Sequence, residues 1–303
     1  MRFLLLYIAA ALLLPYGARA ETKPVVFGMI STESSQNLKS QWEPFLKDME
    51  RKLGRPVKTY FASDYAGVIE AMRFGKVDLA WYGNKSAIEA VDRAGGEVFA
   101  KILSVDGYPG YHSVLIVQKD SPIKNLDDIL AAPGKYSFGN GDPNSTSGFL
   151  IPSYYVFAKH NIDPKKHFTR VVNGSHEVNA LAVAKKQLDI ATCNTSMVGD
   201  PDRDPKAGRI WQTNPGLAKE LRVVWKSPLI AHEPLVWRKN LPEEDKTALR
   251  DFFFGYGKTE EEKKILAGIN NGIGAFRPSD NAQLNPIREV ERYRDELLKK
   301  AAP

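Results

Sequence analysis

The chain has 303 residues, more than one small hydrophobic core supports, so we expect two domains. Its 42 lysines and arginines slightly outnumber its 36 aspartates and glutamates. Because the two kinds are interspersed without a basic tract, the charge disfavours nucleic-acid binding. The single cysteine, Cys193, excludes an intramolecular disulfide and is expected to be a small buried hydrophobic residue.

The first twenty residues have the composition of an export signal. Arg2 precedes an apolar run over 3–14, and Ala18-Arg19-Ala20 fits the small-x-small cleavage rule. The alternative is a membrane anchor, but the run is shorter than the roughly 20 residues that a spanning helix needs. We therefore predict a signal peptide over 1–20, a periplasmic mature chain from Glu21 with net charge +4, and no direct insertion into the membrane.

Strand-like and helix-like segments alternate through the next two hundred residues. The expected strands cover 25–30, 57–61 and 76–82. The expected helices cover 38–53, a short segment capped by Asp64, and 85–93. This alternation predicts an α/β fold with parallel sheets covered by helices.

Two later strands, 112–118 and 221–225, each end near a proline, Pro122 and Pro228. We interpret both places as crossings between lobes, so that lobe one holds 21–118 plus 227–303 and lobe two holds 119–226. Two crossings make a hinge, and a ligand is expected in the cleft between the lobes. C-terminal helices over 242–256, 260–267 and 286–300 are expected to pack on lobe one.

The most informative segment is the glycine-rich turn over 137–149. A strand leads into Gly139-Asn140-Gly141, and a helix is expected to begin just after Asn144. The first turn of that helix would present free amide groups together with the hydroxyls of Ser145, Thr146 and Ser147, which suits an anion. Each hydrogen bond to a charged oxygen contributes roughly 1.5–3 kcal/mol. The alternative is an ordinary capped helix without a ligand.

Several motifs of enzymes and nucleotide-binding proteins are incomplete in this sequence. Gly139-x-Gly141 lacks the third glycine of a dinucleotide fingerprint, because Asn144 stands there. Phe252 replaces the first glycine of a P-loop ahead of Gly257-Lys258-Thr259. The five histidines have no metal spacing, and no G-x-S-x-G elbow is present. We therefore expect neither an enzyme nor a metal or cofactor site.

Three tyrosines stand just beyond expected strands, where a cleft would meet them: Tyr65, Tyr82 and Tyr111. Each phenol offers one donor, although a tyrosine at a strand end is often half-buried packing. His176 opens another expected helix, in lobe two, and its imidazole can donate to an oxyanion or simply cap the helix.

With these residues the chain resembles the phosphonate-binding proteins of bacterial ABC importers, which have the type II periplasmic binding protein fold. The resemblance covers residues 25 to about 260, and the segment 144–148 in its Gly-Asn-Gly-Asp-Pro context is its most specific part. The other matching stretches are Ile30-Ser31-Thr32-Glu33-Ser34, Asp64-Tyr65-Ala66-Gly67, Ala80-Trp81-Tyr82-Gly83-Asn84, Asn179-Ala180-Leu181-Ala182-Val183-Ala184 and Trp225-Lys226-Ser227-Pro228-Leu229-Ile230.

The resemblance implies a phosphonate held by Ser145, Thr146 and Ser147, assisted by His176 from the same lobe and by Tyr65 and Tyr111 from the other. It also implies carboxylates around an aminoalkyl group at the positions that are Ser196 and Glu233 here. Because Ser196 is neutral, binding of 2-aminoethylphosphonate is expected to weaken unless Asp200 or Asp202 compensates. The implied partner is an ABC importer permease with its ATPase.

Two alternatives to phosphonate binding follow from the same residues. A binding protein for phosphite, phosphate or sulfonate would use the same anion-binding turn. A periplasmic phosphonate or phosphate ester hydrolase would need a metal cluster or an activated nucleophile, for which the sequence has no recognisable spacing.

Overall fold

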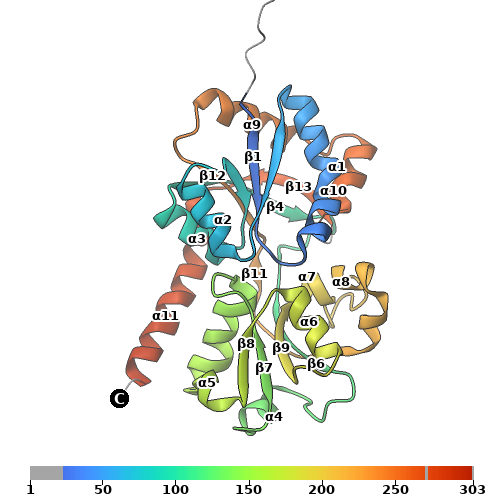
Figure 1. Cartoon of the computed structure of the whole chain (residues 1–303), viewed down its shortest axis with the longest axis vertical. Helices are drawn as coiled ribbons and strands as arrows, with labels where there is room; N and C mark the ends of the chain where they lie inside the picture. The colour runs from blue at the N-terminus through green and yellow to red at the C-terminus, as the bar shows by residue number, and fades with distance from the viewer. Residues whose placement is uncertain (1–22, 270–271, 302–303) are drawn as a thin grey trace, which may run out of the picture.

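The computed structural model describes residues 23–269 and 272–301, in two lobes stacked along the long axis of the molecule (Figure 1). The predicted signal peptide over 1–20 lies outside the described residues. Each lobe has its own sheet, and a two-stranded ribbon joins them. The expected two-lobed α/β architecture is confirmed.

The sheet of lobe one has the strand order β13-β4-β12-β3-β1-β2. Strands β1 and β2 are parallel, as are β1 and β3, whereas β12 and β4 are antiparallel to their neighbours and β13 is antiparallel to β4. The expectation of parallel sheets is therefore wrong for half of this lobe, because β12 and β13 return from the C-terminal part. The strands are β1 (Val25–Met29), β2 (Val57–Phe61), β3 (Leu79–Trp81), β4 (Gly96–Ser104), β12 (Pro234–Arg238) and β13 (Ile273–Pro278).

The helices of lobe one bury their apolar faces in one continuous core. Phe45 lies at its centre and packs on the rings of Phe252, Phe253, Tyr256 and Phe276 at centroid distances of 4.9–5.7 Å. Asp64 caps its helix as expected, since its side chain accepts from the Gly67 amide. The helices are α1 (Ser35–Leu53), α2 (Tyr65–Arg73), α3 (Asn84–Arg93), α9 (Glu243–Gly255) and α10 (Glu260–Ala267).

The sheet of lobe two has the order β10-β6-β9-β7-β8. Strand β6 (Ser113–Gln118) is buried along its whole length and pairs antiparallel with β9 (Ile190–Asn194) and β10 (Leu221–Lys226). The predicted boundary, which left this strand in lobe one, is wrong because β6 completes the second sheet. The other strands are β7 (Ser137–Asn140) and β8 (Arg170–Asn173).

Short helical segments cover the sheet of lobe two. The α-helices are α4 (Leu126–Leu130), α5 (Pro164–His167), α6 (His176–Ala184), α7 (Thr195–Val198) and α8 (Arg209–Thr213). The π-helical and 3-10 segments are η1 (Thr146–Leu150), η2 (Ser153–Phe157), η3 (Ala158–His160) and η4 (Pro215–Lys219).

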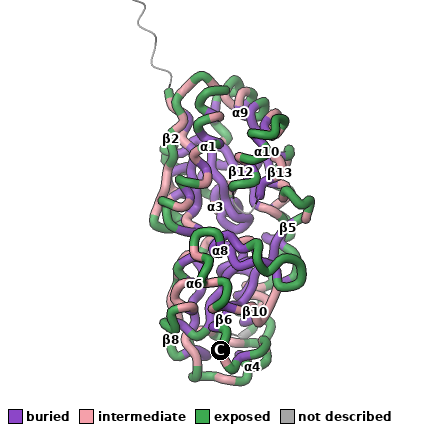
Figure 2. The backbone as a smooth tube through the Cα atoms, turned by 90° about the vertical axis from the view of Figure 1, so that its right-hand side faces the viewer, coloured by how far each residue is buried: buried purple, intermediate pink, exposed green. Residues whose placement is uncertain are grey.

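The two crossings between the lobes run side by side. Ser113 and Ser227 exchange hydrogen bonds, with the Ser227 amide donating to the Ser113 carbonyl and the Ser113 amide to Ser227 Oγ. The ribbon β5 (Gly110–Tyr111) and β11 (Ile230–Ala231) pairs just inside lobe one. Buried backbone continues through this junction near β5 (Figure 2). The structure thus puts the crossings near 112 and 227.

The C-terminal helix packs on lobe one, as expected, and also contacts lobe two. After η5 (Asn281–Leu284), helix α11 (Asn285–Ala301) contacts α3 of lobe one and then runs along the η1, η2 and η3 segments of lobe two (Figure 1). The rings of Tyr154 and Tyr293 lie 6.4 Å apart in this contact. α11 therefore bridges the lobes outside the hinge.

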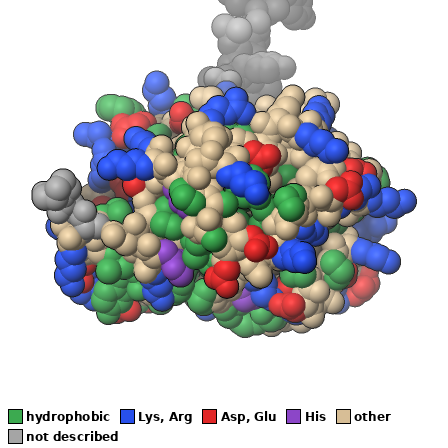
Figure 3. All heavy atoms as spheres, turned by 90° about the horizontal axis from the view of Figure 1, so that it is seen from below, with side chains coloured by type: hydrophobic (Ala, Val, Ile, Leu, Met, Phe, Trp, Pro, Cys, Tyr) green, Lys and Arg blue, Asp and Glu red, His purple; other side chains and the backbone are tan. Residues whose placement is uncertain are grey.

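The outer face of the protein carries charges of both signs. On the face seen in Figure 3, lysine and arginine side chains alternate with aspartate and glutamate. Within the described residues, no helix is long and apolar enough to span a bilayer.

Candidate functional site

The glycine-rich turn is built on close backbone packing. The Gly141 amide donates to the Gly148 carbonyl at 2.8 Å, and a Cβ on Gly141 would lie 2.5 Å from the backbone of Gly148. Ser145, rather than Asn144, is the N-cap, because its Oγ accepts from the Gly148 amide at 3.0 Å. The expected helix start is therefore one residue too early. The amides of Thr146 and Ser147, which follow the cap, lie where a helix has no internal acceptors.

Two tyrosines of lobe one meet the hydroxyls of this turn. The Tyr65 phenol lies close enough to Ser145, and the Tyr111 phenol to Thr146 and Ser147, for these hydroxyls to affect the pKa of each phenol. Burial, together with nearby carboxylates, raises the pKa of both phenols well above the usual value. Both phenols therefore keep their protons at neutral pH and remain hydrogen-bond donors.

Thr146 is also held from the opposite lobe. The Lys85 amide, in the first turn of α3, donates to Thr146 Oγ1 at 2.8 Å. Gly83 precedes that helix, and a Cβ there would lie 3.1 Å from the same oxygen. The N-termini of two helices, one from each lobe, thus converge on one hydroxyl.

His176, the first residue of α6, completes the group. Its Nε2 lies 3.5 Å from Ser147 Oγ, which also accepts from Asn194 Nδ2 at 3.3 Å. Burial, with a smaller contribution from the positive charge of Arg209, lowers the pKa of His176 to about 4. The imidazole is therefore neutral at pH 7. Its Nδ1 is buried without a hydrogen-bond partner among the described residues.

Two of the residues predicted from the sequence do not join this group. The Tyr82 hydroxyl donates to the Val68 carbonyl at 3.1 Å, so this tyrosine is a core residue of lobe one. The half-buried Asn144 donates its amide to Asp142 Oδ1 at 2.7 Å and does not cap the helix. The hydroxyl-rich group therefore consists of Tyr65, Tyr111, Ser145, Thr146, Ser147 and His176.

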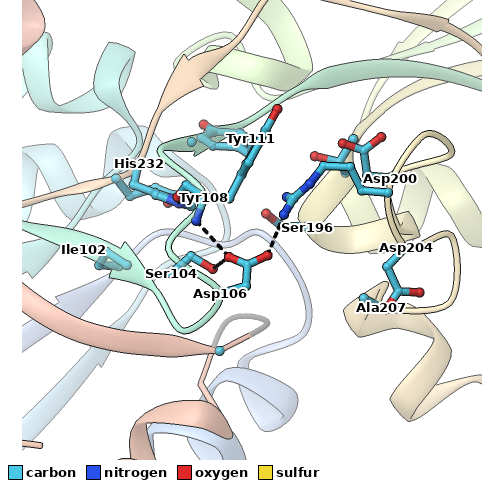
Figure 4. A pocket seen from close by; sticks show the side chains of 15 residues that line it. Ile102, Ser104, Asp106, Tyr108, Tyr111, Ser196, Asp200, Asp204, Ala207 and His232 are labelled. Carbon is cyan, nitrogen blue, oxygen red and sulfur yellow. Dashed lines mark hydrogen bonds and ion pairs between the residues drawn. The ribbon is translucent and has the colours of Figure 1, made fainter.

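A pocket of about 430 Å³ adjoins this group, and Tyr111 forms part of its wall. Ser196 and Glu233, predicted from the resemblance, both line it. Figure 4 shows Tyr111, Tyr108 and His232 on one side of the pocket and Ser196, Asp200 and Asp204 on the other. The lining also includes Asp106 and Arg203, so it contains four carboxylates and one guanidinium. This excess of negative charge favours a cationic group.

Contacts that sequence reasoning missed hold the two lobes together. The carboxylate of Glu33, in lobe one, lies 2.8 Å from the guanidinium of Arg209, in lobe two, and both side chains are almost fully buried. Glu177 of α6 accepts from the Ser34 amide and from Asn37 Nδ2 of α1. Asp142 accepts from the Tyr65 amide. The structure is therefore that of closed lobes.

No group of three or more histidine, cysteine, aspartate and glutamate side chains in residues 23–269 and 272–301 is arranged to hold a metal ion. Cys193 is buried, and its burial raises the pKa of the thiol to about 12. A protonated, enclosed thiol of this kind is a packing residue, as the sequence predicts.

Several known proteins are similar to this chain. The chain is 54% identical over 295 residues to the phosphonates-binding periplasmic protein of Escherichia coli K12, covering 97% of this chain and 84% of that protein. It is 32% identical over 228 residues to a phosphate-import protein of Mycolicibacterium smegmatis, covering 72% and 67%. The crystal structure of a binding protein component of an ABC phosphonate transporter from Pseudomonas aeruginosa is 56% identical, with a TM-score of 0.87 and coverage of 92% and 89%.

A family model describing the periplasmic substrate-binding protein of phosphonate ABC transporters matches residues 27–284. This match spans both lobes, including the glycine-rich turn and the adjoining pocket. The chain belongs to the periplasmic substrate-binding proteins of phosphonate ABC transporters.

Proposed function

We propose that this protein captures phosphonates between its lobes after export through a signal peptide over 1–20, and delivers them to a membrane permease with its ATPase. The observation that carries the proposal is a contact between the lobes at the turn: Thr146 Oγ1, of lobe two, accepts from the Lys85 amide of lobe one at 2.8 Å, beside the Tyr111 phenol of lobe one. A ligand that joins donors from both lobes stabilises the closed form over the open one.

The phosphonate oxygens are bound by neutral donors in this proposal. The donors are the hydroxyls and amides of the turn, the two phenols and the neutral His176 imidazole, that is Tyr65, Tyr111, Ser145, Thr146, Ser147 and His176. No lysine or arginine side chain is needed among them, because hydrogen bonds to a charged oxygen are worth roughly 1.5–3 kcal/mol each. The free His176 Nδ1 supports this role, since a buried nitrogen without a partner is costly unless a ligand or water satisfies it.

The organic group of the ligand would enter the adjoining pocket. Glu233 lies at the inner end of that pocket, near enough to Tyr111 and Tyr65 to affect both phenols. An ammonium group beside Glu233 would be attracted to it, so we propose aminoalkylphosphonates, with 2-aminoethylphosphonate as the first candidate. Lys226 pairs with Asp200 at 3.0 Å and also with Asp202, so these two carboxylates are already partly neutralised.

Calorimetry of two single variants tests the anion site. Thr146→Ala and His176→Ala should each weaken binding of methylphosphonate by roughly tenfold to a hundredfold, as expected for one hydrogen bond to a charged oxygen. Thr169→Ala, which removes an exposed hydroxyl elsewhere in lobe two, should leave the affinity unchanged. Unchanged affinity in both site variants would show that the anion binds elsewhere.

A thermal-shift panel tests the cargo. Methylphosphonate, 2-aminoethylphosphonate, phosphate, phosphite and an alkanesulfonate would be compared at equal concentrations, since a ligand that binds only the folded state raises the melting temperature. The proposal predicts the largest shifts for the two phosphonates. A larger shift for phosphate, phosphite or the sulfonate would reassign the cargo without changing the fold or the site.

A further inference from the structure

One side chain of lobe two reaches across the pocket to lobe one. Arg203 lies in the segment between α7 and α8 of lobe two, and its Nη2 lies 2.9 Å from Asp106 Oδ2 of lobe one. The same guanidinium lies 3.6 Å from the ring centroid of Tyr108. Arg203 thus spans the rim of the pocket and contacts both an anion and an aromatic face on the other side.

Asp106 and Tyr108 are held in place independently of Arg203. Ser104 Oγ and the Tyr108 amide donate to Asp106 Oδ1 at 2.6 and 3.0 Å, which leaves Oδ2 free for a cation. The Tyr108 hydroxyl lies 2.9 Å from His112 Nε2, so the ring also has a fixed position. Burial alone would raise the pKa of Asp106, but these hydrogen bonds and Arg203 lower it to about 2. A carboxylate beside an aromatic face is a general binding site for cations.

The contact between Arg203 and Asp106 can exchange with solvent. Their side chains are 39% and 49% exposed, so neither is locked in by packing. An exposed ion pair contributes little by itself, and a competing cation that reaches the same site from inside the pocket can replace it. The pocket offers such a route, because Glu233 and Ser196 lie within the same lining as Asp106 and Arg203.

We propose that Arg203 determines which substituents the pocket accepts, by occupying the cation site formed by Asp106 and Tyr108 when the ligand is short. The inference rests on the proposed phosphonate-binding function. A methyl or aminoethyl group leaves the site to Arg203, which then helps to hold the lobes closed. An ammonium group on a longer chain competes with Arg203 for the same site, so long aminoalkylphosphonates bind less tightly than short ones.

Calorimetry with three ligands tests this proposal: methylphosphonate, 2-aminoethylphosphonate and 4-aminobutylphosphonate. In Arg203→Ala the two short ligands should weaken by roughly threefold to thirtyfold, as expected for loss of an exposed ion pair and a cation–π contact. The long ligand should bind as tightly as before or more tightly. The preference for short ligands would then shrink or reverse. The matched control is Arg55→Ala, which removes an ion pair with Asp245 within lobe one and should not change the preference.

A second variant separates the cation site from simple lobe closure. Asp106→Asn also removes the contact with Arg203, so short ligands should weaken as in Arg203→Ala. Unlike Arg203→Ala, it also removes the carboxylate that the long ligand would use, so the long ligand should weaken too.

Equal losses for all three ligands in Arg203→Ala, or no loss at all, would overturn the proposal. Failure of the unaltered protein to bind any of the three phosphonates would instead remove the proposed function on which the inference rests.

Discussion

The carboxylate of Glu33 and the guanidinium of Arg209 form an ion pair between the lobes at 2.8 Å, with side chains only 2% and 3% exposed. Glu33 lies just before α1 in lobe one, and Arg209 is the first residue of α8 in lobe two. A pair sealed this completely exists only while the lobes are closed, so it contributes directly to the balance between open and closed forms.

Replacing Glu33 with glutamine should weaken ligand binding strongly. The change leaves the Arg209 guanidinium buried opposite a neutral amide in the closed form, whereas the open form restores water to it. Breaking a buried pair costs about 3–5 kcal/mol, which corresponds to a loss of affinity of roughly a hundredfold to several thousandfold. Calorimetry with methylphosphonate measures this loss of affinity. Glu43→Gln, which removes an exposed pair with Lys47, is the control and should bind normally.

Small-angle scattering tests whether this loss comes from closure. Glu33→Gln should show a larger radius of gyration than the unaltered protein at the same subsaturating ligand concentration. Equal radii together with normal affinity would mean that the ion pair does not influence the balance between the open and closed forms.

The neutral His176 makes stability depend on pH. Its pKa is about 4 in the folded protein against an ordinary value of 6.5, so the unfolded state binds more protons between these values. Its contribution to stability is complete above pH 6.5 and is lost as the pH falls toward 4, by about 3 kcal/mol.

Urea unfolding from pH 7 to pH 4 measures this contribution. The loss of stability should be smaller by that amount in His176→Gln than in the unaltered protein. His160→Gln, a change at an exposed histidine, should follow the unaltered curve. Identical pH dependence in all three proteins would contradict a neutral, buried His176.

The packing of Gly141 against Gly148 should make the turn intolerant of a methyl group. Gly141→Ala places a Cβ 2.5 Å from the Gly148 backbone, so the turn must shift, at a cost of roughly 1–3 kcal/mol. Urea unfolding would detect the lower stability, and calorimetry a loss of phosphonate binding. Gly216→Ala introduces a methyl with no atom within 4 Å and should be neutral in both measurements.

Restoring a carboxylate at position 196 should favour amines. Ser196 is half-buried in the pocket lining, and Ser196→Asp adds a negative charge there. The ratio of affinities for 2-aminoethylphosphonate and methylphosphonate should rise by roughly tenfold, in the range of one charge-assisted hydrogen bond. Ser196→Asn, which adds a neutral side chain of the same shape, should leave the ratio unchanged. A rise in both variants would point to size rather than charge.

Local features of the fold were predictable because they depend on neighbouring residues. The cap at Asp64 and helices such as α10 (Glu260–Ala267) follow from hydrophobic spacing and capping residues within a few positions. The sequence also predicts strand β6, but its place in the second sheet depends on pairing with β9 and β10, which are distant in sequence. The lobe boundary was misplaced for that reason.

The candidate site likewise contains some residues that the sequence predicts and others that it does not. The hydroxyls of 145–147 could be predicted because they follow one another on one helix start. Tyr82 and Tyr65 look alike in the sequence, since each follows a strand, yet only the structure shows that the Tyr82 hydroxyl is bound to Val68. The contacts of Glu33 with Arg209 and of Asp106 with Arg203 join residues from different lobes. No local spacing predicts such pairs.

Helix α11 links the two lobes along one flank of the molecule, because it contacts α3 of lobe one and the η1, η2 and η3 segments of lobe two. A swing that parted the lobes on that flank would have to pull Tyr293 away from Tyr154, whereas parting them on the flank of α8 leaves this contact intact (Figure 1). We therefore expect the lobes to part beside α8 rather than beside α11.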